Sequence, residues 1–461
     1  MRIFDQLRDT HVKKDGLGAW AICFCALINN AVVVGIDSSF GVIIASVIET
    51  LDSNPSAVSW IPSIRSTCMY FVAWVSTMLV QRFGFRVVFT AGAVLSCLAF
   101  AVAVLNENFI ILMLSYGIIG GSAAGLLHAP GNIVVSYYFE KHRKIASGIA
   151  ICGGGVGIAI IEPLTNLINI TFGPKGVYVA FSLLSLLPLF LSIATFPTDD
   201  NDDANNHGIK ELQSQSKHKI HLGRRLTVYQ IPTNSHTDRK LSIFNLKLPV
   251  LLNERKPMSF LDKFALLKDF RLLFYCLSHI TFLLAFYIPI DYLPEMMVEE
   301  HGLPKSVGGT IMAIFGVSQI VGRASSGVIA TVLTRHSIII SSLSMVGIGS
   351  GIIGFVFCST YREFIGATIF YGLCIGCFYY NSVNILAEMY GVTDKFQDAY
   401  GLLMLASAIS PIWGPPIGGM LHEYFGKFYM SFMAAGIFAY VSAFCNIIVF
   451  FIHFKKYQKQ I

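Results

Sequence analysis

Twelve apolar stretches of the sequence are each long enough to cross the roughly 30 Å hydrocarbon core of a bilayer as an α-helix. Six of them precede one long polar stretch, and six follow it. The pattern predicts an all-α membrane protein in which twelve transmembrane helices form two six-helix bundles, related as parallel repeats. The stretches are residues 18–46, 58–80, 86–105, 109–137, 144–171, 176–196, 270–292, 306–331, 337–358, 363–389, 399–422 and 428–453.

The composition agrees with a membrane protein. Hydrophobic residues make up 54% of the chain, charged residues make up 13%, and the mean hydropathy is +0.63. Such a chain has too few polar groups to cover a water-soluble globule. The net charge of +6 does not indicate a nucleic-acid partner, because the basic residues are confined to segments between the apolar stretches. The ten cysteines lie almost all within apolar stretches, which favours packing over disulfide bonding.

Basic residues also predict which segments face the cytoplasm. Residues 1–17 and 454–461 are expected to be cytoplasmic tails, and residues 197–269 a cytoplasmic linker. The linker has no periodic apolar stripe, so we expect it to be largely disordered. The two bundles then cover 18–196 and 270–453, and lipid of the plasma membrane surrounds them. The basic residues behind this prediction are Arg2, Arg8, Lys13, Lys14, Arg82, Arg86, Lys141, Arg143, Lys144, Lys455, Lys456 and Lys459.

The run YFEKHRKIASGIAICGGGVG, residues 138–157, joins two apolar stretches and indicates a conformational hinge. Its basic residues suit a tight turn held at the anionic cytoplasmic face. The small residues that follow fall on nearly one side of the next helix, which permits close contact with another helix. The hinge residues assigned on this basis are Lys141, Arg143, Gly148, Gly153 and Gly157.

This run resembles the fifth-helix signature of the monocarboxylate transporter family in the major facilitator superfamily, roughly YFxKRRxxAxGxAxxGxxxG, with His142 in place of one arginine. KDGLGAW, which contains Asp15, Gly16 and Trp20, is similar to the family's signature at the start of the first helix. The resemblance implies a carrier of small organic acids, and a single-span immunoglobulin-like chaperone as a partner.

A second part of the resemblance concerns the eleventh span. GPPIGG, residues 414–419, resembles the family's helix-eleven breaker. Prolines and glycines there bend a span without leaving its backbone groups facing lipid. Gly414, Pro415 and Pro416 are therefore assigned to a flexible gate or a kink.

Four charged residues are expected at bilayer depth, where a charge is costly unless it faces a cavity or a partner. They are Arg323, Asp37, Arg65 and Glu162. Arg323 is the main candidate for substrate binding, because a guanidinium offers a fork of donors that suits a carboxylate. The resemblance agrees, since the family's eighth helix carries a substrate-binding arginine in a similar string. The alternative is a permanent structural pair with Asp37 or Glu162.

Two positions depart from the family's pattern. Proton-coupled members have an aspartate one turn before the arginine and a lysine in the first helix, whereas this chain has Gln319 and Ser38. Neither side chain titrates in the physiological range. The sequence therefore argues against proton coupling by the family's usual route, and leaves His128, His279 and Glu162 as other groups able to carry a proton.

Asp37 and Arg65 are expected at similar depths, about 10 to 15 Å below the outer surface. They either pair with each other or share a cavity in which Asp37 binds a substrate cation. The second arrangement, with Arg323 on the opposite side, suits a zwitterion such as an amino acid. Polar residues assigned to the same pocket, in addition to Ser38 and Gln319, are Asn132, Tyr379 and Asn381.

The leading prediction is a secondary transporter of small organic acids across the plasma membrane, working by alternating access. One alternative is a pH-insensitive carrier of zwitterionic or aromatic amino-acid-like substrates. Another is a receptor or scaffold that binds a ligand without moving it. We expect no enzymatic activity, metal or cofactor, because the sequence has no phosphate-binding glycine loop with a lysine, no zinc-spaced cluster and no nucleophile elbow.

Overall fold

The computed structural model describes residues 14–52, 58, 60–105, 108–194, 264–304, 306–332, 337–391 and 394–458. These residues are almost all helical, and none of them forms a strand. The predicted fold class is therefore confirmed. The cytoplasmic tails fall partly outside the described residues and the disordered linker falls almost entirely outside them, so both stay predictions.

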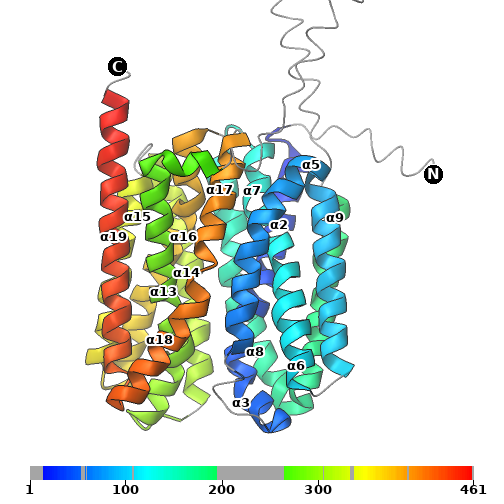
Figure 1. Cartoon of the computed structure of the whole chain (residues 1–461), viewed down its shortest axis with the longest axis vertical. Helices are drawn as coiled ribbons and strands as arrows, with labels where there is room; N and C mark the ends of the chain where they lie inside the picture. Colours follow the sequence, from blue (N-terminus) through cyan, green and yellow to red (C-terminus); the bar gives the residue numbers. More distant parts are fainter. Residues whose placement is uncertain are drawn as a thin grey trace, which may run out of the picture. The chain divides into compact units, whose positions relative to one another are not determined.

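In the described chain, the N-terminal half contains eight helical elements, several of which are parts of one membrane span (Figure 1). They are α2 (Leu17–Ser38), α3 (Phe40–Leu51), α5 (Trp60–Leu105), α6 (Phe109–Leu112), the π-helix η1 (Met113–Ile119), α7 (Gly120–Tyr138), α8 (Arg143–Leu184) and α9 (Leu186–Ala194). The C-terminal half begins with the short 3-10 helix η2 (Ala265–Lys268). Its longer helices are α13 (Phe270–Glu299), α14 (Ser306–Val332), α15 (Ser337–Phe357), α16 (Tyr361–Tyr390), α17 (Asp394–Ser407), α18 (Ser410–Phe425) and α19 (Tyr429–Gln458).

Two elements are too long for a single crossing. α5 has 46 residues, which corresponds to about 69 Å of helix, and α8 has 42. Each contains one glycine with a left-handed backbone, Gly84 (φ 79°) in α5 and Gly173 (φ 68°) in α8, where the chain turns back. Ten helical segments of the described chain are apolar enough to span a membrane. Dividing the two long ones at these glycines gives the twelve predicted segments.

The helices pack mainly within each half. α5 packs on α7 and α2 on α8 in the N-terminal half, and α14 on α16 and α13 on α19 in the C-terminal half. The two halves meet where α8 packs against α14 and α5 against α17. The hinge helix α8 therefore contacts both halves.

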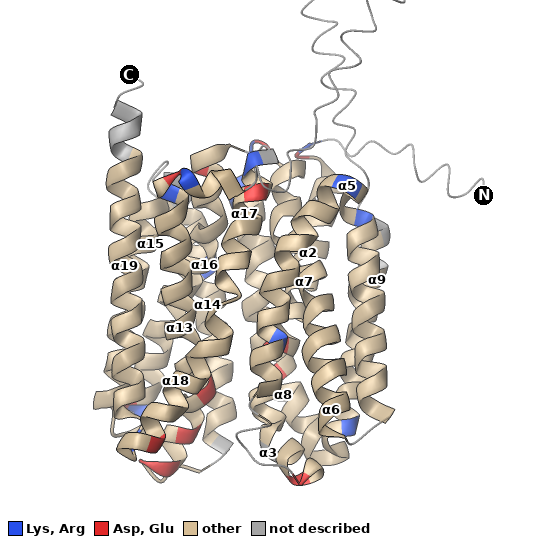
Figure 2. Cartoon of the chain, viewed as in Figure 1, with Lys and Arg blue, Asp and Glu red and all other residues tan. Residues whose placement is uncertain are grey.

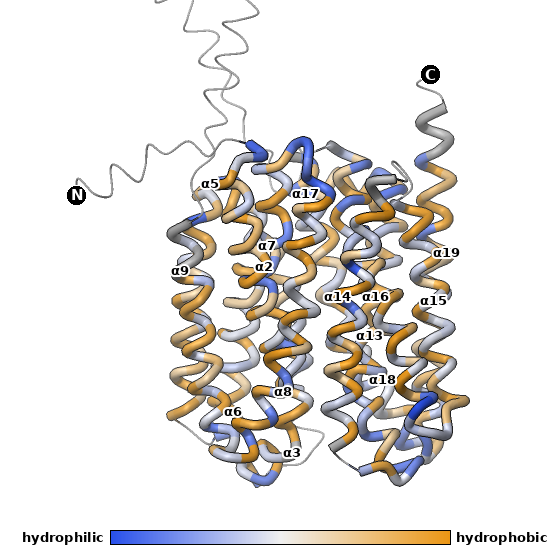
Figure 3. Tube along the Cα trace, turned by 180° about the vertical axis from the view of Figure 1, so that it is seen from behind, coloured by the Kyte–Doolittle hydropathy of each residue, from blue (hydrophilic) through white to orange (hydrophobic). Residues whose placement is uncertain are grey.

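Charged residues gather at the two ends of the helices (Figure 2), and hydrophobic residues cover the length between them (Figure 3). One end carries the turn in α5, the α7–α8 turn and the start of α13. We call it the basic end, after Arg82, Arg86, Lys141, Arg143 and Lys268. The positive-inside rule predicts that this end faces the cytoplasm, and this orientation stays a prediction.

The start of α2 and the α7–α8 turn form one structural unit. The Asp15 carboxylate accepts hydrogen bonds from the backbone N–H groups of Glu140 (3.3 Å), Lys141 (3.1 Å) and His142 (3.1 Å). The Asp15 N–H donates to the Tyr138 carbonyl at 3.1 Å. The two sequence signatures therefore meet in space.

Replacing Asp15 with alanine is expected to speed hydrogen exchange at the amides of residues 140–142, because it removes their acceptor. The Lys141 amide and its neighbours hold the pKa of Asp15 below its ordinary value of 3.8. The contact is therefore present above pH 3.8 and is lost only as the pH falls through the lowered value. Mass spectrometry of exchanged peptides measures this effect, and unchanged exchange in the variant would contradict it.

Two helix boundaries differ from those expected. The seventh span was predicted to end at residue 292, but α13 continues to Glu299. The eleventh span is interrupted at Ala408 and Ile409, before the GPPIGG string, and α18 runs through Pro415 and Pro416. The Pro415 carbonyl accepts a hydrogen bond from the Tyr292 hydroxyl at 2.9 Å, which links α18 to α13.

Candidate substrate site between the two halves

Arg323 lies on α14, facing α8 of the other half, with 3% of the residue exposed. Its Nη1 donates to the Ile151 carbonyl at 2.9 Å, and its Nη2 donates to Gln319 Oε1 at 2.8 Å. The guanidinium carbon lies 5.3 Å from the centre of the Tyr379 ring, a cation–π distance. Its Nε has no hydrogen-bond partner among the described residues.

No acidic side chain of the described residues lies within ion-pair distance of Arg323, whose contacts are a carbonyl, an amide and an aromatic ring. The structure thus does not support a permanent pair with Asp37 or Glu162. The guanidinium remains charged, because its deprotonation is not accessible in proteins. A buried cation without a protein counter-ion is a place where an anion binds favourably.

The glycines of α8 contact both halves. Gly153 and Gly157 face α2, where a Cβ at either position would overlap the carbonyl oxygen of Leu27 or Ala31. Gly154 faces Arg323, and a Cβ there would lie 2.7 Å from Nη1. Gly155 also faces α14. The three consecutive glycines therefore lie in two helix interfaces, α8–α2 and α8–α14.

Replacing Gly154 with valine is expected to displace the Arg323 guanidinium while leaving the α2–α8 contact intact. We expect carboxylate uptake to fall by roughly tenfold, which corresponds to about 1.4 kcal/mol of lost binding. Initial uptake rates in proteoliposomes measure this. Gly366→Val is the control, because a Cβ at Gly366 meets no neighbouring atom. Equal rates in both variants would contradict the prediction.

Asp37 and Arg65 form an ion pair, with 3.2 Å between Asp37 Oδ1 and Arg65 Nε. The Ser66 hydroxyl also donates to the Asp37 carboxylate at 3.2 Å. The guanidinium of Arg65 packs over the Tyr116 ring at 4.7 Å and is almost fully buried. The sequence left open whether Asp37 pairs with Arg65 or binds a substrate cation in a shared cavity. In this structure the two residues are paired.

Glu162 lies deep in α8, at 5% exposure. Its carboxyl group interacts with the Ser38 hydroxyl. The second oxygen, Oε2, has no partner among the residues that the structure describes. Ser38, where the family carries a lysine, also donates to the Gly35 carbonyl at 3.2 Å.

Asn132 takes part in a polar junction across the two halves. Its Nδ2 donates to the Tyr400 hydroxyl of α17 at 3.0 Å and lies 3.2 Å from His128 Nε2. Its Oδ1 accepts from Asn30 Nδ2 at 3.2 Å. The candidate proton carrier His128 thus sits at the interface between the halves.

Asn381 and His279 lie apart from this junction. Asn381 Nδ2 donates to the Ser326 hydroxyl at 2.9 Å and so joins α16 to α14 within the C-terminal half. His279 packs among aromatic rings, including those of Tyr275 at 4.9 Å and Phe378 at 5.1 Å. Asn381 was predicted in the substrate pocket and His279 as a proton carrier, and these contacts of both residues lie within one half.

Three residues of the site were not identified from the sequence. The Tyr70 hydroxyl, on α5, interacts with the hydroxyls of Tyr287 and Tyr379 from the other half. Asp291, on α13, is solvent-accessible and lies close enough to Asp37 for the two carboxylates to repel each other. Asp291 escaped notice because its span was expected to end one residue later.

Of the remaining hinge residues, Gly148, Lys141 and Arg143 lie at the basic end. A Cβ at Gly148 would lie 3.0 Å from the Tyr380 ring, and the Tyr380 hydroxyl donates to the Lys144 carbonyl at 3.1 Å. Lys141 and Arg143 flank the turn that Asp15 holds. Gly414 lies on α18 and faces α13, where a Cβ added to it would lie 3.5 Å from the Leu284 carbonyl oxygen.

Within the described chain no group of three His, Cys, Asp or Glu side chains is placed to hold a metal.

Comparison with known proteins agrees with this architecture. A family model described as Major Facilitator Superfamily matches residues 22–292 and 275–460. The chain is 23% identical over 431 residues to monocarboxylate transporter 2 of Homo sapiens, covering 92% of this chain and 84% of the relative. It is 24% identical over 453 residues to monocarboxylate transporter 1 of Bos taurus, covering 97% and 87%. It is also 24% identical over 454 residues to monocarboxylate transporter 10 of Mus musculus, covering 97% and 81%. The chain therefore belongs to the major facilitator superfamily, and these relatives within it are monocarboxylate transporters.

Proposed function

We propose that the protein is a secondary carrier that moves small organic acids across the plasma membrane, with Arg323 binding the substrate carboxylate. The observation that carries this proposal is the buried guanidinium without an acidic partner among the described residues. A charge at membrane depth is costly, so a charged residue retained there is a candidate for substrate binding. The relatives are named monocarboxylate transporters, which supports a carboxylate as the transported substrate.

Alternating access is supported by how the halves are joined. At the basic end, Gln81 Nε2 donates to Asp398 Oδ1 at 3.1 Å, and the Tyr380 hydroxyl donates to the Lys144 carbonyl. Both bonds cross from one half to the other. Rocking of the halves breaks them and opens this end, so that the substrate reaches Arg323 from either side in turn.

The coupling proposed here does not use the family's aspartate–arginine pair, because Gln319 stays neutral. Replacing Gln319 with aspartate is expected to make uptake pH-dependent, roughly tenfold slower at pH 8 than at pH 6. The introduced carboxylate, when ionised, would compete with the substrate for Arg323, and its protonation would free the guanidinium. Initial rates at the two pH values measure this, with Gln319→Asn as the uncharged control. Equally flat profiles for the aspartate and asparagine variants would contradict the prediction.

A zwitterionic substrate is the second candidate, and the position of Asp291 favours it. Arg65 can neutralise only one of the two carboxylates, Asp37 and Asp291. The other, Asp291, interacts electrostatically with Asp37, which in turn lies near the Tyr70 and Tyr287 hydroxyls. An amino acid with its carboxylate on Arg323 and its ammonium near Asp291 would satisfy both poles.

A screen of radiolabelled substrates in proteoliposomes, carried out at two pH values, tests the proposal. Uptake of lactate or a similar acid supports the first candidate, and pH-insensitive exchange of amino acids supports the second. Saturable binding without flux of any substrate would favour a receptor or scaffold and would contradict transport.

A further inference from the structure

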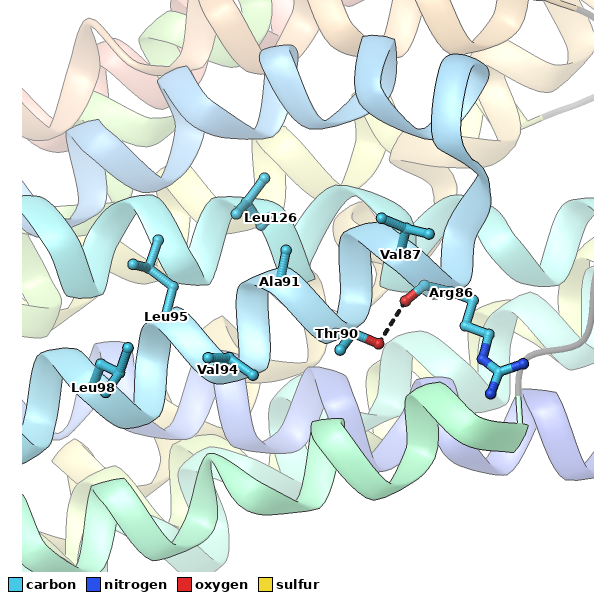
Figure 4. A pocket seen from close by; sticks show the side chains of 8 residues that line it. All are labelled: Arg86, Val87, Thr90, Ala91, Val94, Leu95, Leu98 and Leu126. Carbon is cyan, nitrogen blue, oxygen red and sulfur yellow. Dashed lines mark hydrogen bonds between the residues drawn. The ribbon is translucent and has the colours of Figure 1, made fainter. Parts of the chain in front are cut away.

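A surface hollow of about 650 Å³ in the N-terminal half shares no residue with the substrate site (Figure 4). Most of its lining comes from α5, in the segment that follows Gly84, and one residue comes from α7. Apart from Arg86 and Thr90, the lining is aliphatic. The residues are Arg86, Val87, Thr90, Ala91, Val94, Leu95, Leu98 and Leu126.

The length of the hollow matches one leaflet of a bilayer. Arg86 and Leu98 are twelve residues apart on one helix, a rise of about 18 Å. Half of the hydrocarbon core is about 15 Å. Ala91 is a small residue between larger aliphatic neighbours of the lining (Figure 4). The hollow therefore runs along a single leaflet, from the basic end toward the middle of the membrane.

Arg86 stands at the basic end of the hollow, and its guanidinium extends past the aliphatic side chains (Figure 4). None of the acidic side chains in the described part of the chain forms an ion pair with it. The one hydroxyl in the lining, that of Thr90, is already hydrogen-bonded to the Arg86 carbonyl and to Ser192, both at 2.9 Å. Arg86 is therefore the polar residue of the lining that is available to bind a ligand.

We propose that this hollow binds an anionic glycerophospholipid, with the phosphate on Arg86 and one acyl chain along α5. Guanidinium and phosphate form strong paired hydrogen bonds. The cytoplasmic leaflet, to which the basic end is assigned, is the one rich in anionic lipid. The inference is independent of the transported substrate.

The test uses the purified full-length protein in nanodiscs of phosphatidylcholine, with and without a minor fraction of phosphatidylglycerol. Native mass spectrometry measures which lipid stays bound after extraction. We expect phosphatidylglycerol to be retained about fivefold over phosphatidylcholine, the preference that one arginine near the surface supplies. Arg86→Gln should abolish the preference. Ala91→Phe, which fills the hollow from the lipid side, should reduce retention of both lipids.

Arg362→Gln is the matched control, because Arg362 is an exposed arginine at the start of α16, at the opposite end. It should leave the preference unchanged. Thermal unfolding in phosphatidylcholine alone checks that every variant is folded. Equal retention of the two lipids by the unmodified protein, or an Arg86→Gln variant with the preference intact, would overturn the proposal. So would a second copy or a single-span helix found in the hollow by cross-linking, with no lipid retained.

Discussion

Replacing Arg323 with leucine is expected to reduce carboxylate uptake by roughly 30-fold or more. Removing one partner of a buried, hydrogen-bonded charge pair costs about 2–5 kcal/mol, and the substrate carboxylate is the proposed partner. Arg323→Lys should also lose most activity, because an ammonium keeps the charge but lacks the planar fork that Ile151 and Gln319 hold in place. Initial uptake by equal amounts of reconstituted protein measures both effects.

Thermal unfolding separates this loss from a folding defect. Arg323→Leu removes a buried charge that lacks an acidic partner among the described residues, so the variant should unfold at the same temperature as the unmodified protein or higher. Arg362→Leu, at an exposed helix end, serves as the control and should transport normally. A folded Arg323→Leu protein that carries its substrate at an unchanged rate would refute the proposed function.

Replacing Arg65 with methionine is expected to destabilise the protein by about 3–5 kcal/mol, because it leaves Asp37 without its partner in the interior. Asp37→Asn should be milder, since Arg65 keeps its contacts with the Tyr116 carbonyl and ring. The double variant, Asp37→Asn with Arg65→Met, should recover most of the lost stability. Thermal unfolding of the three variants in one detergent gives the comparison.

The same variants test whether Asp37 has a role beyond its ion pair. If the pair is only structural, the stable double variant should transport every substrate of the unmodified protein. If Asp37 and Asp291 bind a substrate ammonium, uptake of zwitterions should fall in the double variant, and uptake of simple acids should not. Failure of the double variant to recover stability would show that the Asp37–Arg65 pairing is not what stabilises this region.

The sequence was sufficient for the fold because the membrane imposes it. Lipid requires each crossing segment to satisfy its own backbone, so the apolar stretches mark the helices directly. The same reasoning located Arg323, Asp37, Arg65 and Glu162, since a charge inside an apolar stretch is visible without any structure. These inferences depend on local sequence only.

The partners of those residues depend on tertiary contacts that local sequence does not contain. Asp37 had two possible roles until the 3.2 Å contact with Arg65 was seen. Tyr70 and Tyr287 are ordinary aromatic residues of apolar stretches, and only the packing of the halves brings them together. The break at Ala408 and Ile409 was also missed, although Pro411 at the start of α18 lacks the N–H that would continue the helix and was the signal that could have located it.

The consecutive glycines of α8 have a consequence for how the protein tolerates change. On one side they lie against a helix of the same half, a contact that the proposed rocking of the halves does not change. On the other side they lie against α14 of the C-terminal half, which moves relative to α8 in the proposed rocking. Glycines have no side chains that would interlock with α14 during this movement. Adjacent positions are thus subject to different demands: bulk at Gly153 should disrupt packing within the N-terminal half, whereas bulk at Gly155 should disturb the contact between the halves, where an added Cβ would lie 2.8 Å from Ile320.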